Sequence, residues 1–163
     1  MGAGLSRSRF RFRHPHDGRH EGAGNGKDDE MRFMLLQNYG EVGSGAPAMP
    51  EWTPEDIQAH IEFQIALNAH LVESGELVDA QGLAGPDQAR FVESDGTGAP
   101  VITDGPYPES KELVAGYRIL DVDSLDRALE VAAQASAAPG PGGVPLRDRI
   151  EVREVMSAPA SDE

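Results

Sequence analysis

The chain has 163 residues, 39% of them hydrophobic, which is enough for one domain with a modest core. It contains no cysteine and no apolar run long enough to cross a bilayer, so disulfides and thiolate chemistry are excluded and we expect a cytoplasmic protein that does not enter a membrane. The formal net charge is −14 at pH 7, and residues 31–163 carry 8 basic and 23 acidic side chains, so direct binding to nucleic acid is not expected.

Residues 1–30 differ from the rest of the chain. Arginine alternates with Ser and Phe at the start, and Gly, His and Asp follow without a sustained hydrophobic period. Such a segment cannot bury apolar surface, so we expect either a disordered extension or an artefact of the assigned gene start. On either interpretation the domain begins at Met31 and extends to residue 156.

A strand and then a long helix are predicted at the start of the domain. Residues 32–39 form a short, nearly continuous apolar run, which is typical of a central strand, and residues 40–50 form a loop rich in Gly and Pro. Thr53 then precedes Pro54 and two acidic residues, a combination that marks the start of a helix. We expect this helix to stop at Gly75.

A polar stripe divides the apolar face of this helix. His60, Gln64 and Asn68 line up at 100° per residue, whereas His70 points away from them. Polar groups in an apolar face are costly to bury without partners, so two interpretations remain open. Either the stripe lies over a dimer seam or a solvent groove, or it lines a pocket in which His60 transfers a proton near neutral pH. The apolar residues on its two sides are Ile57, Ile61, Ile65, Ala69 and Val72, and Phe63, Leu67 and Leu71.

Short strands are predicted next, at residues 77–83, 89–93 and 101–103, where turn sequences separate the segments of a meander. Residues 113–122 form a longer strand that is apolar except for Arg118 and Asp121. A second helix then begins after Asp123 or Ser124, with one face made of Leu125, Ala128, Leu129 and Ala132. The remaining segments are a linker at 135–148, a final strand at 150–156 and a loose tail at 157–163.

This order of elements predicts an α+β fold. The helices are too few for a doubly wound sheet, so we expect a ferredoxin-like sandwich in which an antiparallel sheet has two helices on one face. The other face of the sheet is then left uncovered. A partner subunit is the simplest cover, and a symmetric homodimer is therefore expected.

Residues 104–117 are the most unusual stretch of the chain. They read Asp-Gly-Pro-Tyr-Pro-Glu-Ser-Lys-Glu-Leu-Val-Ala-Gly-Tyr, so a rigid turn leads into a charged cluster and then a strand. In a structural interpretation, Asp104 forms an Asx-type turn. In a functional one, the turn holds the Asp104 carboxylate, the Tyr107 ring and nearby charges around a cavity. Those charges belong to Glu109, Lys111 and Glu112.

This segment resembles the signature of the bacterial YCII-related family, in particular a branch named for an Asp-Gly-Pro-Phe motif, with Tyr107 in the aromatic position. The likeness spans residues 31–156 and includes the segments at 73–78 and 150–153. It implies the dimeric α/β-barrel variant of the ferredoxin-like fold. It also implies a functional link to sigma factors of the extracytoplasmic-function group, with which this branch is associated.

Relatives in the family are suspected of using a His and Asp pair for small-molecule chemistry. The resemblance puts Gln64 in the position of that His, with His60 one turn earlier, and no Asp stands near residue 139. The pair therefore does not carry over residue by residue.

Two hypotheses of function follow. In the first, a small molecule binds between helix and sheet for a lyase- or isomerase-type reaction, with His60 as proton carrier and Asp104 as second acid or base. The residues expected to bind and orient that ligand are Gln64, Asn68, Tyr107, Glu109 and Lys111. In the second, the protein is a non-catalytic sensing or interaction module that docks through residues 104–112. Metal-ligand spacing and a glycine-rich phosphate loop are absent from the sequence, so neither a metal nor a cofactor is expected.

Overall fold

The computed structural model describes residues 31–40, 42–105 and 114–156. The predicted extension at 1–30 and the predicted tail at 157–163 lie outside this range. So do three predicted ligand-binding residues, Tyr107, Glu109 and Lys111.

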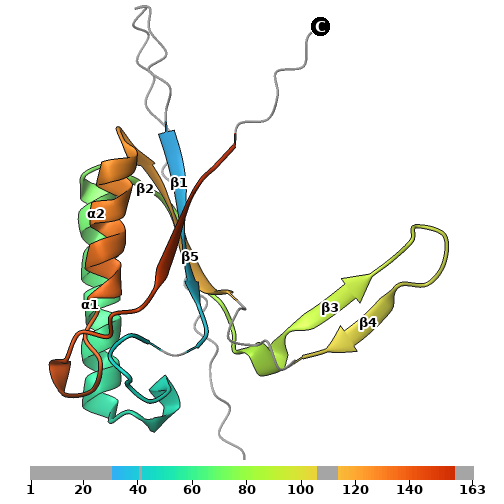
Figure 1. Cartoon of the computed structure of the whole chain (residues 1–163), viewed down its shortest axis with the longest axis horizontal. Helices are drawn as coiled ribbons and strands as arrows, with labels where there is room; N and C mark the ends of the chain where they lie inside the picture. Colours follow the sequence, from blue (N-terminus) through green and yellow to red (C-terminus); the bar gives the residue numbers. More distant parts are fainter. Residues whose placement is uncertain (1–30, 41, 106–113, 157–163) are drawn as a thin grey trace, which may run out of the picture.

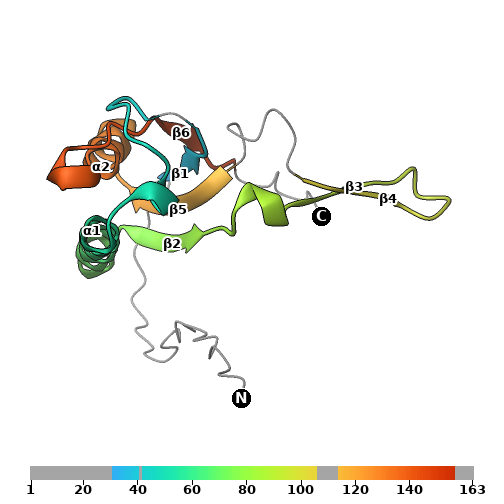
Figure 2. The ribbon, with the colours of Figure 1, turned by 90° about the horizontal axis from the view of Figure 1, so that it is seen from below.

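A four-stranded antiparallel sheet forms the centre of the domain, with strand order β2-β5-β1-β6. The two long strands β1 (Met31–Asn38) and β5 (Val114–Val122) lie in the middle, and β2 (Leu77–Gly82) and β6 (Ile150–Glu154) lie at the edges. Helices α1 (Pro54–Glu73) and α2 (Leu125–Ser136) lie on the same side of this sheet (Figures 1 and 2). The predicted α+β fold of ferredoxin-like type is confirmed.

Both helices begin with the caps expected from the sequence. The Thr53 hydroxyl accepts a hydrogen bond from the backbone N–H of Asp56, and the Ser124 hydroxyl accepts one from the N–H of Arg127, each at 3.2 Å. Helix α1 ends before Gly75, whose φ of +76° is readily adopted by glycine and ends the helical path. Neither described helix has the length and apolarity needed to cross a membrane.

The core lies between the sheet and the two helices. Alternate residues of β1 and β5 point into it, as the two-residue period of a strand requires. Of the predicted face of α2, Ala128 and Ala132 are buried, whereas Leu125 and Leu129 are nearly half exposed. Val131 and Ala135 complete the buried face. The core consists of Phe33, Leu35, Leu67, Leu71, Leu120, Val122, Ala128, Val131, Ala132 and Ala135.

The predicted meander is wrong in one respect. Only β2 joins the main sheet, whereas β3 (Arg90–Glu93) and β4 (Val101–Asp104) form a separate two-stranded hairpin that projects from the body (Figure 1). Gly105 packs closely where this hairpin meets the body, because a Cβ there would lie 2.9 Å from the carbonyl oxygen of Pro86. The glycine of the unusual segment is thus explained by close packing.

The predicted linker at 135–148 is more ordered than expected. Helix α2 extends into it, and Pro139 pairs with Pro145 on either side of a short 3-10 turn, η4 (Pro141–Gly143). The final strand ends at Glu154, two residues before its predicted end. Two further 3-10 turns, η1 (Met49–Glu51) and η2 (Pro86–Gln88), lie in the loops after β1 and β2.

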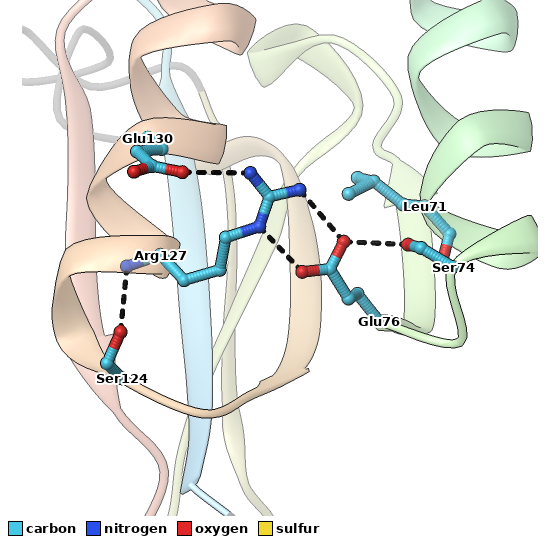
Figure 3. A network of polar contacts seen from close by, with 6 residues as sticks. All are labelled: Leu71, Ser74, Glu76, Ser124, Arg127 and Glu130. Atoms are coloured by element: carbon cyan, nitrogen blue, oxygen red, sulfur yellow. Dashed lines mark hydrogen bonds and ion pairs between the residues drawn. The ribbon is translucent and has the colours of Figure 1, made fainter.

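An ion-pair clamp joins the start of β2 to the start of α2 (Figure 3). Arg127 donates from Nε and Nη2 to the two carboxylate oxygens of Glu76, at 2.6 and 3.0 Å, and from Nη1 to Glu130 at 2.9 Å. The Ser74 hydroxyl lies 2.7 Å from the same carboxylate. Hydrogen bonds from Arg127 and Ser74 lower the pKa of Glu76 to about 2. The clamp therefore connects the segment between α1 and β2 with the first turn of α2, which is far from it in sequence.

Candidate functional site

The polar stripe of α1 faces a buried arginine on the sheet. Arg118 lies in β5 on the face that the helices cover, and it is only 5% exposed. Its Nε donates to the side-chain oxygen of Asn68 at 2.7 Å, and its Nη2 donates to the side-chain oxygen of Gln64. Its Nη1 lies 3.5 Å from the side-chain oxygen of Gln37, at the end of β1. The stripe therefore holds a guanidinium group between helix and sheet.

His60 continues this set of contacts on α1. Its Nδ1 lies 3.0 Å from the carbonyl oxygen of Pro139, and its Nε2 lies 3.3 Å from the amide nitrogen of Gln64. A carbonyl oxygen can only accept, so Nδ1 carries the hydrogen and Nε2 of the neutral ring is left to accept from Gln64. The Gln64 oxygen meanwhile accepts from Arg118. The hydrogen bonds thus run in one direction, from Arg118 through Gln64 to His60.

A second branch runs from Arg118 to a carboxylate. The amide nitrogen of Gln37 donates to Oδ2 of Asp148 at 3.2 Å. Burial raises the pKa of Asp148, and the bonds from Gln37 and from the N–H of Arg149 oppose this rise. Hydrogen bonds through Gln37, Arg118 and Gln64 connect Asp148 to His60. We call the six residues His60, Gln64, Asn68, Arg118, Gln37 and Asp148 the Arg118 network.

Two loops meet next to Asp148. The N–H of Gly43, after β1, donates to the carbonyl oxygen of Arg147 at 2.9 Å, and a side chain at Gly43 would collide with that oxygen. Arg147 adopts a φ of +56°, which is uncommon for a residue with a side chain and immediately precedes Asp148. Trp52 packs edge-on against the His60 ring, with centroids 5.5 Å apart. These contacts fix the backbone around both titratable groups.

Arg118 has only neutral acceptors. Its three partners are side-chain amides, and among the described residues no carboxylate lies within ion-pair distance of its guanidinium. Burial lowers the pKa of Arg118 for this reason, since no charged group compensates the lost hydration. A cation held by amides alone is an unusual centre for a protein core.

Asp104, the other predicted catalytic residue, is not part of the network. It ends β4, its side chain is 74% exposed, and it forms an ion pair with Arg90 at 2.9 Å across the hairpin. The hairpin and α1 lie on opposite sides of the sheet in both views (Figures 1 and 2). His70 is exposed, as expected, and lies beside a hollow between α1 and α2.

Sequence reasoning missed three members of the network, Gln37, Arg118 and Asp148. One signal was available for Arg118, which is the only basic residue in an otherwise largely apolar strand. It also shares its face with Leu120 and Val122, which predicts burial. Asp148 lies in a Pro- and Gly-rich segment without hydrophobic periodicity, so no pattern in the sequence indicates its position.

The described surface has hollows elsewhere. One of about 360 Å³ lies at the base of the hairpin, between Tyr39, Leu83 and Phe91, and another of about 410 Å³ lies between Phe63 of α1 and Gln134 of α2. Neither is lined by a residue of the Arg118 network. Within the described ranges no three His, Asp or Glu side chains are grouped as a metal site would require.

Comparisons with known proteins identify the family of the domain. Residues 31–154 match the YCII-related domain. An uncharacterized protein of Rhizobium meliloti (strain 1021) is 31% identical over 97 residues, which cover 59% of this chain and 77% of that protein. The family match includes all of the main sheet, both helices and every residue of the network.

Proposed function

The chain belongs to the YCII-related domain family, and we propose that it binds a small molecule at the Arg118 network, where His60 exchanges a proton with it in a lyase- or isomerase-type reaction. One observation carries this proposal. The hydrogen-bond chain from Arg118 through Gln64 leaves Nε2 of His60 as a proton acceptor, while the Pro139 carbonyl holds the ring in place.

Asp148 is the better candidate for the second acid or base. The His and Asp pair of the relatives does not carry over residue by residue, but the Arg118 network holds one carboxylate, that of Asp148, which accepts from Gln37. Its burial favours the protonated form, which can donate a proton to a substrate. Asp104 remains the choice made from sequence, and its exposed ion pair with Arg90 gives no comparable reason for proton transfer.

The two hollows do not reach the network, and we propose that a side chain moves to admit a ligand to Nε2 of His60. Gln64 is the simplest candidate because it is half-buried and its amide nitrogen occupies the acceptor lone pair of His60. Rotation of Gln64 would expose Nε2 to a ligand and let the Gln64 amide orient that ligand.

A metabolite screen by thermal shift on the full chain tests the proposal. A compound that binds only the native state raises the melting temperature, and we expect at least one such compound. His60→Asn should abolish turnover of that compound, whereas the matched variant His70→Asn, on the exposed side of the same helix, should leave it unchanged. Turnover that persists in His60→Asn, with His70→Asn as reference, contradicts the proposal.

A second candidate function is a non-catalytic sensing or interaction module linked to a sigma factor of the extracytoplasmic-function group. It is favoured by the exposed apolar side of α1, where Ile61, Ile65 and Val72 are 48, 62 and 60% exposed. Titration of the labelled chain with a purified sigma factor of this group distinguishes the two. Under this candidate Ile65→Glu weakens binding and His60→Asn does not.

We further propose a cytoplasmic homodimer that pairs through the open face of the sheet. By the alternation of β1 and β5, Met34, Leu36, Tyr117 and Ile119 lie opposite the helices and are only half-buried. Ile119→Glu should yield monomers in sedimentation velocity, and Leu129→Glu, on the outer side of α2, should not. A wild-type chain that sediments as a monomer at high micromolar concentration refutes this part.

A further inference from the structure

The most distinctive feature of the network is that its arginine is buried without a described carboxylate partner. Arg118 is nine-tenths buried, yet its acceptors are three neutral amides. A buried charge is normally matched by an opposite charge, because amide dipoles replace only part of the lost hydration. The burial that lowers the pKa of Arg118 is not offset by any carboxylate of the described chain.

The guanidinium also has donors to spare. Arginine carries five N–H groups, and three of them account for the contacts with Asn68, Gln64 and Gln37. One N–H on each terminal nitrogen therefore has no acceptor among the described residues. A pair of donors on the two terminal nitrogens matches the two oxygens of a single carboxylate.

We propose that Arg118 is the anchor for a carboxylate group of the ligand, and that the ligand is a monoanionic organic acid. This deepens the function proposed above and rests on it for the location of the site. The single negative charge of such a ligand matches the single positive charge of Arg118, since the network contains one arginine. A dianion such as phosphate fits less well, because Asp148 lies at the end of one branch and the protein carries a net charge of −14.

Gln37 is the group that yields to the carboxylate. Its contact with Nη1 of Arg118 is 3.5 Å, at the outer limit of a hydrogen bond, so displacing it loses little. Asn68 remains on Nε at 2.7 Å and keeps the guanidinium oriented. The bound acid then lies between His60 on one branch and Asp148 on the other.

Matched acids and amides test this assignment on the full chain. The probes are benzoate and acetate, with benzamide and acetamide as neutral isosteres, and with chloride at equal ionic strength. At a tenfold excess over its dissociation constant, benzoate should favour the native state about 11-fold and raise the melting temperature by about 5 °C. The amides and chloride should have no such effect. A benzoate shift no larger than that of chloride overturns the proposal.

Variants then locate the binding. Arg118→Gln should remove the benzoate shift, and a shift of equal size in this variant would indicate an adventitious additive only and refute the assignment. Gln37→Ala keeps Arg118 and removes its weakest partner, so it should bind benzoate at least as tightly as the wild type. If Arg118→Gln does not fold, weaker binding by Gln37→Ala still overturns the proposal.

His60→Asn separates this inference from the proposed reaction. It should keep the benzoate shift, because His60 does not contact the guanidinium. If His60→Asn both binds benzoate and still turns over the compound from the screen, the proposed reaction is refuted and the anion site is not. If instead the protein binds an uncharged ligand through His60 and does not bind benzoate, the anion site alone is refuted.

Discussion

Replacing Glu76 by Gln tests the clamp that joins the start of β2 to the start of α2. The change keeps the shape of the side chain and removes its charge, so Arg127 loses a bidentate ion pair. A pKa lowered from 4.5 to about 2 corresponds to roughly 3 kcal/mol in the absence of screening. The two side chains are 18 and 29% exposed, so solvent screens part of this, and we expect a loss of about 1–2 kcal/mol at pH 7.

The pH dependence follows from the sign of the shift. The folded-state pKa of Glu76 lies below its unfolded value, so the unfolded chain binds the proton more readily. The contribution of Glu76 is therefore fully present above about pH 5 and is lost as the pH falls from about 4.5 towards 2. The difference in free energy of unfolding between wild type and Glu76→Gln should narrow over the same range.

Urea unfolding followed by circular dichroism at pH 7, 4.5 and 3.5 measures this difference. Glu130→Gln is the matched control, because Glu130 contacts the same arginine but is 64% exposed, and it should cost less than about 0.5 kcal/mol. Equal stability of wild type and Glu76→Gln at pH 7, or a difference that stays constant down to pH 3.5, would refute the assignment of a stabilising clamp.

Three further predictions concern the network and the hairpin. Asn68→Ala leaves the Nε–H of Arg118 without its acceptor and should lower the free energy of unfolding by about 1–3 kcal/mol in urea titrations. The control Gln58→Ala, on the exposed side of α1, should change it by under about 0.5 kcal/mol, and equal effects of the two variants would contradict the buried bond. Gly105→Ala introduces a methyl group 2.9 Å from the carbonyl oxygen of Pro86 and should cost about 1–3 kcal/mol, with faster hydrogen exchange in β3 and β4; unchanged exchange there would count against the close packing. Asp104→Asn removes an exposed ion pair and should lower the free energy of unfolding by under about 1 kcal/mol. It should not affect turnover of a compound found in the screen, whereas Asp148→Asn should abolish that turnover, and the reverse result would restore Asp104 as the acid or base.

The exposed side of α1 helps to distinguish the two candidate functions. Ile61, Ile65 and Val72 would be expected to face a core, yet more than two fifths of each side chain is exposed. The sheet covers only the side of the helix that carries Leu67 and Leu71, so the remaining apolar side is free to contact another surface. The response to Ile65→Glu therefore indicates whether this side has a partner or is a tolerated exposed surface.

Local patterns in the sequence were sufficient to predict the elements and the fold class. The caps at Thr53 and Ser124 and the stop at Gly75 depend only on neighbouring residues, so their positions follow from sequence alone. The alternation in β1 and β5 and the order of elements predict the antiparallel sheet with helices on one face. The polar stripe of His60, Gln64 and Asn68 was also visible, because helical periodicity puts residues four apart on one side.

What faces that stripe was decided by the tertiary structure. Arg118 contacts the stripe directly, and Gln37 lies near Arg118 because β1 and β5 pair in one particular register. Asp148 contacts Gln37 next to the backbone contact between Gly43 and Arg147. These contacts link residues separated by tens of positions, and each depends on a side-chain direction that no local pattern specifies. Strand pairing likewise decided that β3 and β4 form a hairpin that is separate from the main sheet. The sequence alone therefore determined that this protein has a polar stripe inside an apolar helix face, and only the fold decided that the stripe surrounds a buried cation.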